Sequence, residues 1–327
     1  MNETKWRHQW LGAQKTIVQW AKSASESFEK NGTQSIVVSY LVDAVHLPHL
    51  DTLANAYQHV YVITEHDICN SWTNVSIHKL PTDFYGAYYI KDAETDGEII
   101  REFNCFMNRI DPIRQSWFYL LYYRGWLDKS MVSFNMHQRS NLWYPSDSVT
   151  DTFNYYHEKT LSSFDFLKDE IQKIIPFKNF VDDDNLCEII LCTKFSLVVE
   201  SYFERTDCRV LSEKIWRAIQ VPRPWLLFAA TGCVQKIRDM GIDVFDDYVD
   251  HDSYDFYDTS ENCVERQEAI LREATRLMHL KVTQNTIADW KKRTLNNRKI
   301  IRSWYENWTS KCRETFDYIN LLAISDD

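Results

Sequence analysis

The sequence predicts an α/β fold with two domains built on parallel sheets, followed by C-terminal helices. Short apolar runs rich in β-branched residues alternate with helical patterns, which is typical of strands joined by crossover helices. A charged stretch at residues 91–98, KDAETDGE, separates two sets of these runs and indicates a domain boundary. The 327 residues include only 7 Gly and 7 Pro, too few for a turn-rich all-β fold.

The first predicted domain, residues 1–98, is a small Rossmann-like unit. Its expected elements are a helix at 3–30, a strand at 35–40, a helix at 49–58 and a strand at 60–63. Asp43 lies just past the first strand, and Glu65 follows the second. Because parallel sheets bind ligands at the carboxyl ends of their strands, these two carboxylates are candidate catalytic residues. The alternative is that both are solvated loop residues.

The second predicted domain covers residues 99–284. Its expected strands lie at 103–107, 131–134, 188–192, 195–199 and 225–229, and its expected helices at 113–127, 212–219, 234–240 and 261–280. Gly125 lies inside the first of these helices, and the alternative is that this helix ends there. Pro222 and Pro224 are expected to stop the helix that begins near Ser212. Residues 285–327 are expected to form one or two further helices that pack across both domains.

The predicted helix start after the strand at 195–199 carries the most specific chemistry. Ser212 is the expected N-cap, and a helix start attracts phosphate. Lys214 adds a full positive charge there, and the Glu213 carboxylate could accept both hydroxyls of a ribose. The pattern therefore indicates a site for a nucleoside diphosphate. The alternative is a surface Glu–Lys pair on an amphipathic helix.

Several segments around this helix start form a longer pattern. They are Val199-Glu200-Ser201, Leu211-Ser212-Glu213-Lys214-Ile215-Trp216, Pro224-Trp225-Leu226-Leu227 and, within 234–245, a Leu/Ile-Arg-x-x-Gly-x-x-x-Phe pattern. With these segments the chain resembles the donor-binding half of GT-B-type glycosyltransferases, which have two facing Rossmann-like domains. It is most similar to the fucosyltransferase-like branch, with its Ser/Thr-Glu-Lys motif, and to viral and bacteriophage relatives. The resemblance covers roughly residues 99–260.

The resemblance implies transfer of a sugar from a UDP- or GDP-sugar to an acceptor hydroxyl, with no metal and no other cofactor. Glu200 is expected near the base or the sugar. A carboxylate of the first domain would deprotonate the acceptor, with Asp43 preferred to Glu65. An Arg pairing at a helix start is the alternative for the arginines, although a guanidinium suits phosphate oxygens. The residues implied as contacts to the donor diphosphate are Asn108, Arg109 and Arg114.

Two acidic runs have the composition of metal sites. Asp182 to Asp184 lies between apolar segments and is expected to form a turn. Asp246 to Asp250 matches the Asp-Asp-x-x-Asp magnesium signature of helical terpene synthases, but the strands expected near 195 and 225 contradict that all-α fold. We therefore predict no metal site in either run.

The acceptor is indicated by charge and by resemblance. The net charge of −10 weighs against nucleic-acid binding, yet residues 281–302 hold seven Lys or Arg and one Asp. The alternative for this segment is a solvated helix face. The residues predicted to meet nucleic-acid phosphates are Lys291, Lys292, Arg293, Arg298 and Lys299.

Three alternatives for the partner follow. Similarity to viral sequences suggests double-stranded DNA with hydroxymethylated pyrimidines as the acceptor. A glycan or a lipid-linked sugar is the alternative acceptor. A protein of another class, a non-catalytic module that binds a nucleotide or a protein on the same fold, is also consistent with the pattern.

The sequence also bears on location. The first ten residues, MNETKWRHQW, lack the apolar segment of a secretory signal. No run approaches the roughly 18 apolar residues of a membrane span. The eight cysteines are scattered without a Cys-x-x-Cys pair, which is typical of reduced thiols. We expect a cytoplasmic protein, in the host cytoplasm if it is viral.

Overall fold

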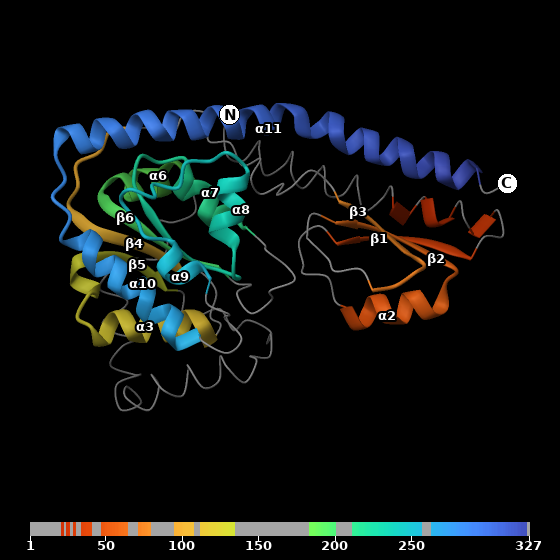
Figure 1. Cartoon of the computed structure of the whole chain (residues 1–327), viewed down its shortest axis with the longest axis horizontal. Coiled ribbons are helices and arrows are strands. Elements are labelled where there is room, and N and C mark those ends of the chain that lie inside the picture. Colours follow the sequence, from red (N-terminus) through yellow and green to blue (C-terminus); the bar gives the residue numbers. More distant parts are fainter. Residues whose placement is uncertain are drawn as a thin grey trace. The chain divides into compact units, whose positions relative to one another are not determined.

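The structure is a computed structural model, and the residues it describes are 21–22, 24–26, 29–30, 34–40, 47–64, 71–79, 95–107, 112–134, 183–200, 211–256 and 263–325. The chain divides into two compact units, one of Met1–Tyr89 with Ile301–Asp327 and one of Ile90–Ile300. Each unit has its own parallel sheet, so the predicted α/β fold is confirmed (Figure 1). The facing, GT-B-like arrangement of two domains stays a prediction.

The first unit contains a three-stranded parallel sheet in the order β1-β2-β3. The predicted strands and the helix between them are confirmed, whereas β3 was not among the predicted elements. Its sequence, VSIHK, has only two apolar side chains, too few to stand out as a buried run. The elements of this unit are β1 (Ser35–Tyr40), α2 (Leu47–Ala56), β2 (His59–Thr64) and β3 (Val75–Lys79).

Helix α2 is fixed to this sheet by side chains of the turn before β3. The Asn74 amide donates to the carbonyl oxygens of Ala54 at 2.7 Å and Tyr57 at 2.9 Å, which satisfies groups at the open end of the helix. The Trp72 indole N–H donates to Asp51 at 2.7 Å. The buried core under the helix consists of Leu50, Val60, Val62 and Val75.

The second unit contains a four-stranded parallel sheet in the order β5-β4-β6-β7. The strands are β4 (Arg101–Met107), β5 (Ser130–Phe134), β6 (Thr193–Val199) and β7 (Trp225–Phe228). The helices of this part of the chain are α3 (Pro112–Tyr123), η2 (Leu127–Lys129), α6 (Asp183–Leu191), α7 (Glu213–Ile219), α8 (Cys233–Asp239), α9 (Asp252–Asp255), α10 (Cys263–Met278) and α11 (Gln284–Ser325).

All strands of this sheet are parallel, but the order in which the chain adds them reverses between β4 and β6. The chain passes from β4 outward to β5, returns to β6 on the other side of β4, and continues outward to β7. Because crossover connections are right-handed, such a reversal puts helices on opposite faces of the sheet. Figure 1 shows α3 and α10 on one face and α6 and α7 on the other. Open α/β sheets bind ligands where the carboxyl ends of the strands meet at such a reversal.

The two strands at the reversal are joined through apolar and polar side chains. The rings of Phe103 and Phe195 stack with their centroids 5.4 Å apart. The buried Asn104 amide donates to the hydroxyls of Thr193 at 2.7 Å and Ser196 at 3.0 Å. A buried amide is stable here because β6 supplies its acceptors. Side chains therefore join β4 and β6 at the point where the strand order reverses.

One predicted strand is wrong. Residues 188–192 were expected to be a strand, but most of them belong to α6, which spans Asp183–Leu191. Most apolar residues of this segment recur at helical spacing, and a helix buries them on one face, with Ile189 only partly buried. The buried set is Leu186, Cys187, Ile190 and Leu191.

Two predicted helix boundaries change. The helix expected at 113–127 ends at Tyr123, because Gly125 takes a left-handed φ of 66° that closes the helix. The one or two helices expected after residue 285 are a single helix, α11, of 42 residues. Residues up to Ile300 belong to the second unit.

The buried side chain of Arg223 binds backbone carbonyl groups at the amino-terminal end of β6. Its guanidinium donates to the carbonyl oxygens of Leu191 at 2.6 Å, Thr193 at 2.7 Å and Gly97 at 3.0 Å. A side chain at position 97 would not fit, since a Cβ there would lie 2.6 Å from the Cβ of Leu191. Burial lowers the pKa of Arg223 to about 10, still high enough to keep its charge at neutral pH.

Candidate functional site

The candidate site lies at the carboxyl end of β6, beside the reversal of the sheet. Glu200 directly follows the strand, and its backbone N–H donates to Phe228 O of β7 at 2.9 Å. Helix α7 begins at Glu213, with Ser212 as the N-cap in extended conformation. The predicted N-cap is therefore confirmed, and the Ser-Glu-Lys triplet lies beside Glu200.

Glu200 is a buried carboxylate whose two oxygens bind one residue. Oε1 accepts the backbone N–H of Ser212 at 3.1 Å, and Oε2 accepts the Ser212 hydroxyl at 2.5 Å. The Glu200 side chain is only 3% exposed. A carboxylate in such a place is stable because hydrogen bonds and a nearby cation replace its water shell.

Lys214 supplies that cation. Its Nζ lies 2.9 Å from the Ser212 hydroxyl oxygen, 3.3 Å from Glu213 Oε1 and 3.6 Å from Glu200 Oε2. The Lys214 side chain is 18% exposed and that of Glu213 is 33% exposed, so both reach the surface. A ligand at this edge would meet an ammonium and a carboxylate side by side.

The ionisation of Glu213 is fixed by its neighbours. Burial by itself would raise its pKa, but the charges of Lys214 and Arg217 outweigh that effect and hold the pKa at about 2. Glu213 is therefore ionised at neutral pH and can accept hydrogen bonds from hydroxyl groups. Arg217 was not predicted as part of the site. It stands one helical turn after Glu213, a spacing that pairs charges on a helix.

The dipole of α7 contributes less than the sequence suggested. The helix has seven residues, and the Ser212 side chain already accepts the N–H of Lys214 at 3.3 Å. A macrodipole needs aligned peptide groups over several turns. The attraction for phosphate at this edge therefore depends on the side-chain charge of Lys214.

Arg114, a predicted diphosphate contact, follows β4, the strand next to β6 at the reversal of strand order. It stands in the first turn of α3, directly after β4, and is 1% exposed. Burial raises the pKa of the Cys105 thiol on β4 to about 12, and the charge of Arg114 opposes that rise, so the two residues are neighbours. The predicted residues that lie outside the described part of the chain are Asp43, Glu65, Asn108 and Arg109.

The five cations of α11 predicted to meet nucleic-acid phosphates do not all face outward. Arg298 is buried, and its Nε donates to Gln220 O at 2.7 Å. Lys291 forms an ion pair with Asp96. Lys292 and Lys299 are exposed. Arg298 is thus turned into the domain, because α11 packs along it, and contact of the other cations with nucleic acid stays a prediction.

Arg293 is the other inward cation. Its guanidinium binds both oxygens of Asp243 at 2.7 Å and lies 2.5 Å from Asp247. It also stacks over the rings of Phe245 and Tyr248. These contacts hold the loop after α8 against α11, so Arg293 has a structural role in this packing.

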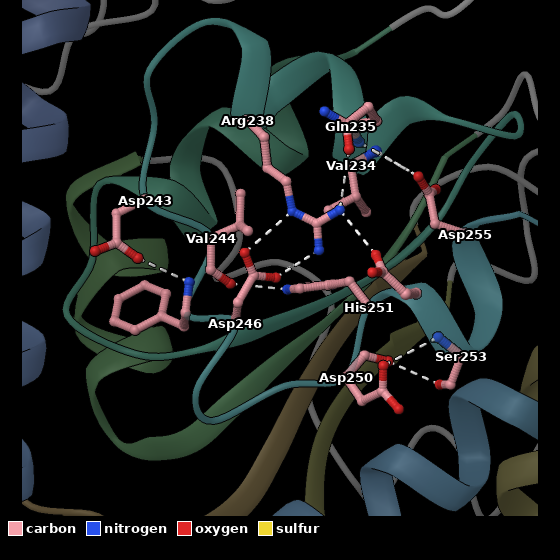
Figure 2. A network of polar contacts seen from close by, with 12 residues as sticks. Val234, Gln235, Arg238, Asp243, Val244, Asp246, Asp250, His251, Ser253 and Asp255 are labelled. Carbon is pink, nitrogen blue, oxygen red and sulfur yellow. Dashed lines mark hydrogen bonds and ion pairs between the residues drawn. The ribbon is translucent and has the colours of Figure 1, made fainter.

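The acidic run after α8 is used in similar ion pairs. Arg238 binds Asp246 with two nitrogens, at 3.1 Å and 2.5 Å, and Asp252 with a third at 2.9 Å (Figure 2). Asp247 pairs with Arg293. Asp246 and Asp247 of the Asp-Asp-x-x-Asp run therefore bind arginines, whereas Asp250 accepts the backbone N–H of Ser253 at 3.2 Å.

A second buried acid, Asp255, lies at the β7–α8 connection and was not predicted. Figure 2 shows its carboxylate at the start of α8, where Oδ2 accepts the N–H groups of Val234 at 3.2 Å and Gln235 at 3.3 Å. Arg266 of α10 lies 3.4 Å from its other oxygen, and both side chains are fully buried. Burial raises the pKa of Asp255 and Arg266 opposes the rise. The sequence signal for this pair was Arg266, a charged residue on the apolar face of the helix predicted at 261–280, which implies a buried acidic partner.

A buried histidine completes this second connection. His251 Nε2 donates to Val244 O at 2.8 Å (Figure 2). Its Nδ1 accepts the Tyr254 hydroxyl. The Tyr254 oxygen in turn accepts the N–H of Leu227 in β7 at 3.3 Å. Burial lowers the pKa of His251 to about 4, although the bond to Val244 opposes that shift. The neutral ring is thus part of the packing.

Comparisons with known proteins identify no relative of this chain from which a role for the site could be taken. No protein-family profile matches the chain, and no curated protein is significantly similar to it in sequence. Within the described ranges, no helix is both long and apolar enough to cross a membrane. In the same ranges, no three His, Cys, Asp or Glu side chains are grouped to hold a metal ion.

Proposed function

We propose that this chain is a glycosyltransferase that moves a sugar from a nucleoside diphosphate sugar to an acceptor hydroxyl. The observation that supports the proposal is the cluster of Glu200, Ser212, Glu213 and Lys214 at the carboxyl end of β6. This cluster stands at the reversal of a parallel sheet, where such folds bind nucleotides. It offers a cation for the diphosphate and a carboxylate for the ribose, both partly exposed.

In this proposal the charges of the second unit stabilise the leaving group. Lys214 offsets the negative charge that grows on the diphosphate as the sugar leaves. Arg114 is 1% exposed, so its charge would act on the diphosphate without the direct contact that the resemblance implies. The ionised Glu213 holds the ribose hydroxyls. Asp43 and Glu65 remain the predicted bases for the acceptor, in that order. Because cationic side chains neutralise the diphosphate, we expect transfer to continue in EDTA, and a loss restored by magnesium would contradict this mechanism.

The packing of α11 weakens the case for duplex DNA, so we favour the alternative acceptor, a glycan or a lipid-linked sugar. The prediction of hydroxymethylated DNA came from the resemblance to viral sequences, with five cations of α11 as the predicted contact surface. Two of these cations, Arg293 and Arg298, are held by other protein groups. With Lys291 paired to Asp96, the exposed pair Lys292 and Lys299 is what remains of that set. Fewer phosphate contacts mean weaker binding to duplex DNA at physiological salt.

The donor site is tested by nucleotide binding. UDP and GDP should each be titrated into the wild-type protein and the Lys214→Ala variant, with Lys292→Ala as a control that removes an exposed lysine elsewhere. At a hundredfold excess over Kd, a bound nucleotide should add about 2.7 kcal/mol to the free energy of unfolding. We expect this gain in the wild type and the control and its loss in Lys214→Ala. Equal gains in all three proteins would refute the site.

Enzyme and binding module are separated by a second assay. A panel of radiolabelled UDP- and GDP-sugars should be incubated with the protein, first alone to detect slow hydrolysis of the donor, then with glycan acceptors and hydroxymethylcytosine DNA. Turnover of a donor supports the enzyme. Tight nucleotide binding without hydrolysis or transfer of any donor would favour the non-catalytic module.

A further inference from the structure

The position of Glu200 points to a role different from contact with the donor. Both carboxylate oxygens are hydrogen-bonded to Ser212, and only 3% of the side chain is exposed. A base or sugar could reach Glu200 only by displacing Ser212 from the start of α7. The carboxylate therefore stands behind the predicted donor-binding residues, on their protein side.

The Ser212 hydroxyl connects Glu200 to Lys214. A serine hydroxyl has one proton to donate, and here that proton goes to Glu200 Oε2 at 2.5 Å. The lone pairs of the same oxygen are thereby turned toward Lys214, whose Nζ donates to it at 2.9 Å. Nζ also lies 3.6 Å from Glu200 Oε2, so the carboxylate attracts the ammonium directly as well.

This arrangement restricts a side chain that is otherwise mobile. Lysine carries its charge on a flexible four-carbon stem, and an unrestrained ammonium loses freedom each time it binds an anion. Lys214 is held before a ligand arrives, because its acceptors are fixed to the end of β6 and the start of α7. Preorganisation of this kind strengthens binding by reducing the entropy lost.

We propose that Glu200 is a positioning residue for sugar transfer, which acts through Ser212 to hold the Lys214 ammonium where the donor diphosphate binds. The inference rests on the proposed function for the identity of the ligand. It differs from a merely structural role, since a buried acid that only stabilised the fold would not control the reactivity of Lys214.

The first test measures Lys214 without any ligand. Acylation of lysines by N-hydroxysuccinimidyl acetate should be followed by mass spectrometry in the wild type, Glu200→Gln and Ser212→Ala, with the exposed Lys299 as the internal reference. We expect Lys214 in Glu200→Gln to react about tenfold faster, equivalent to about 1.4 kcal/mol of lost stabilisation of the ammonium. Ser212→Ala should give a smaller increase, and Ser212→Thr, which keeps the hydroxyl, should match the wild type.

The second test measures the donor site. Calorimetric titration with UDP and GDP should show a Kd about tenfold weaker in Glu200→Gln, and the double variant Glu200→Gln with Ser212→Ala should bind no more weakly than the worse single variant. Such non-additivity is expected of residues that act in series. Circular dichroism of each variant establishes that the protein compared is folded, and Ser212→Ala replaces Glu200→Gln if the latter does not fold.

The outcomes separate this inference from the proposed function. An unchanged rate of Lys214 acylation in both Glu200→Gln and Ser212→Ala would overturn the positioning role, whatever the nucleotide affinity. Faster acylation with an unchanged Kd for UDP or GDP would overturn its relevance to the donor. If the wild type binds neither nucleotide although acylation responds as expected, the proposed function fails, and the role in sugar transfer fails with it.

Discussion

A buried carboxylate lies at each of the two strand-to-helix connections at the carboxyl edge of the second sheet, but the two carboxylates act in opposite ways. Glu200 belongs to its own connection, whereas Asp255 comes from α9. At β6–α7, Glu200 binds the N-cap serine, and the charged ends of Glu213 and Lys214 stay partly exposed. At β7–α8, Asp255 itself occupies the first N–H groups of the helix, and its counter-ion Arg266 is buried with it.

The difference shows which connection can receive a ligand. A helix start whose N–H groups already bind a protein carboxylate has no donors left for a phosphate, and a second negative charge would be repelled. Exposed charges at the neighbouring connection remain able to bind. Of these two connections, β7–α8 has a structural role, and β6–α7 is the candidate binding site. They are called the structural edge and the binding edge below.

The largest expected effect is on the structural edge. Asp255→Ala removes one partner of a buried ion pair, which should lower the free energy of unfolding by about 3–5 kcal/mol. Asp252→Ala is the matched control on the same short helix, because its carboxylate is 62% exposed and should cost at most about 1 kcal/mol. Urea unfolding measures both. Similar losses in the two variants would break the comparison between the edges.

The next effect is on pH dependence, through His251. Its pKa is about 4 in the folded protein, against 6.5 for the free side chain, so folding favours the neutral ring. Its contribution is complete above pH 6.5 and is lost as the pH falls toward 4, by about 3 kcal/mol in total. The free energy of unfolding, measured with urea at several pH values, should fall less steeply between pH 6.5 and 4 in His251→Gln than in the wild type. An unchanged slope would show that His251 is not the titrating group.

A smaller effect is expected at the opposite, amino edge of the sheet. Gly97→Ala places a Cβ against Leu191, and this overpacking should lower the free energy of unfolding by about 1–3 kcal/mol. The acylation rate of Lys214 should stay at the wild-type level, because its contacts lie at the other end of β6. Thermal unfolding and the acylation assay check the two parts. A faster reaction of Lys214 would show that the two edges are coupled.

The smallest effect concerns α11. Lys292→Ala with Lys299→Ala should change the free energy of unfolding by less than about 0.5 kcal/mol, since both side chains are exposed. If duplex DNA binds, the slope of log affinity against log salt should flatten by about one to two units. Arg293→Ala should instead reduce stability, because it removes the partner of Asp243. A wild-type salt slope in the double variant would exclude this helix as the DNA surface.

Local features of the site could be predicted from the sequence, and long-range ones could not. Ser212 as an N-cap follows from residues adjacent in the chain, and so do the strands at β6 and β7. The segment at 188–192 was assigned to a strand because a short apolar run fits a strand or a buried helix. In the structure this segment ends α6, and the strand beside it is β6, which begins at Thr193. The order β5-β4-β6-β7 depends on pairings between distant segments.

Side-chain direction was the other limit. A run of cations on α11 reads as one basic surface, but Arg298 points to Gln220 and Arg293 to Asp243, residues far away in sequence. Glu200 reads equally well as a ligand contact or as an internal anchor, and only the position of Ser212 separates the two. Asp255 and Arg266 likewise become a pair only once the helices α9 and α10 are packed.

Arg223 has a consequence for how the second unit is synthesised and folds. Its guanidinium joins carbonyl oxygens as far away as Gly97, a separation of 126 residues, and those oxygens have no such donor until residue 223 has left the ribosome. Contacts of long sequence separation form slowly, because a large loop must close first. We therefore expect a nascent chain that ends before residue 223 to stay sensitive to protease at residues 95–100, and a chain that includes α7 and β7 to become protected there.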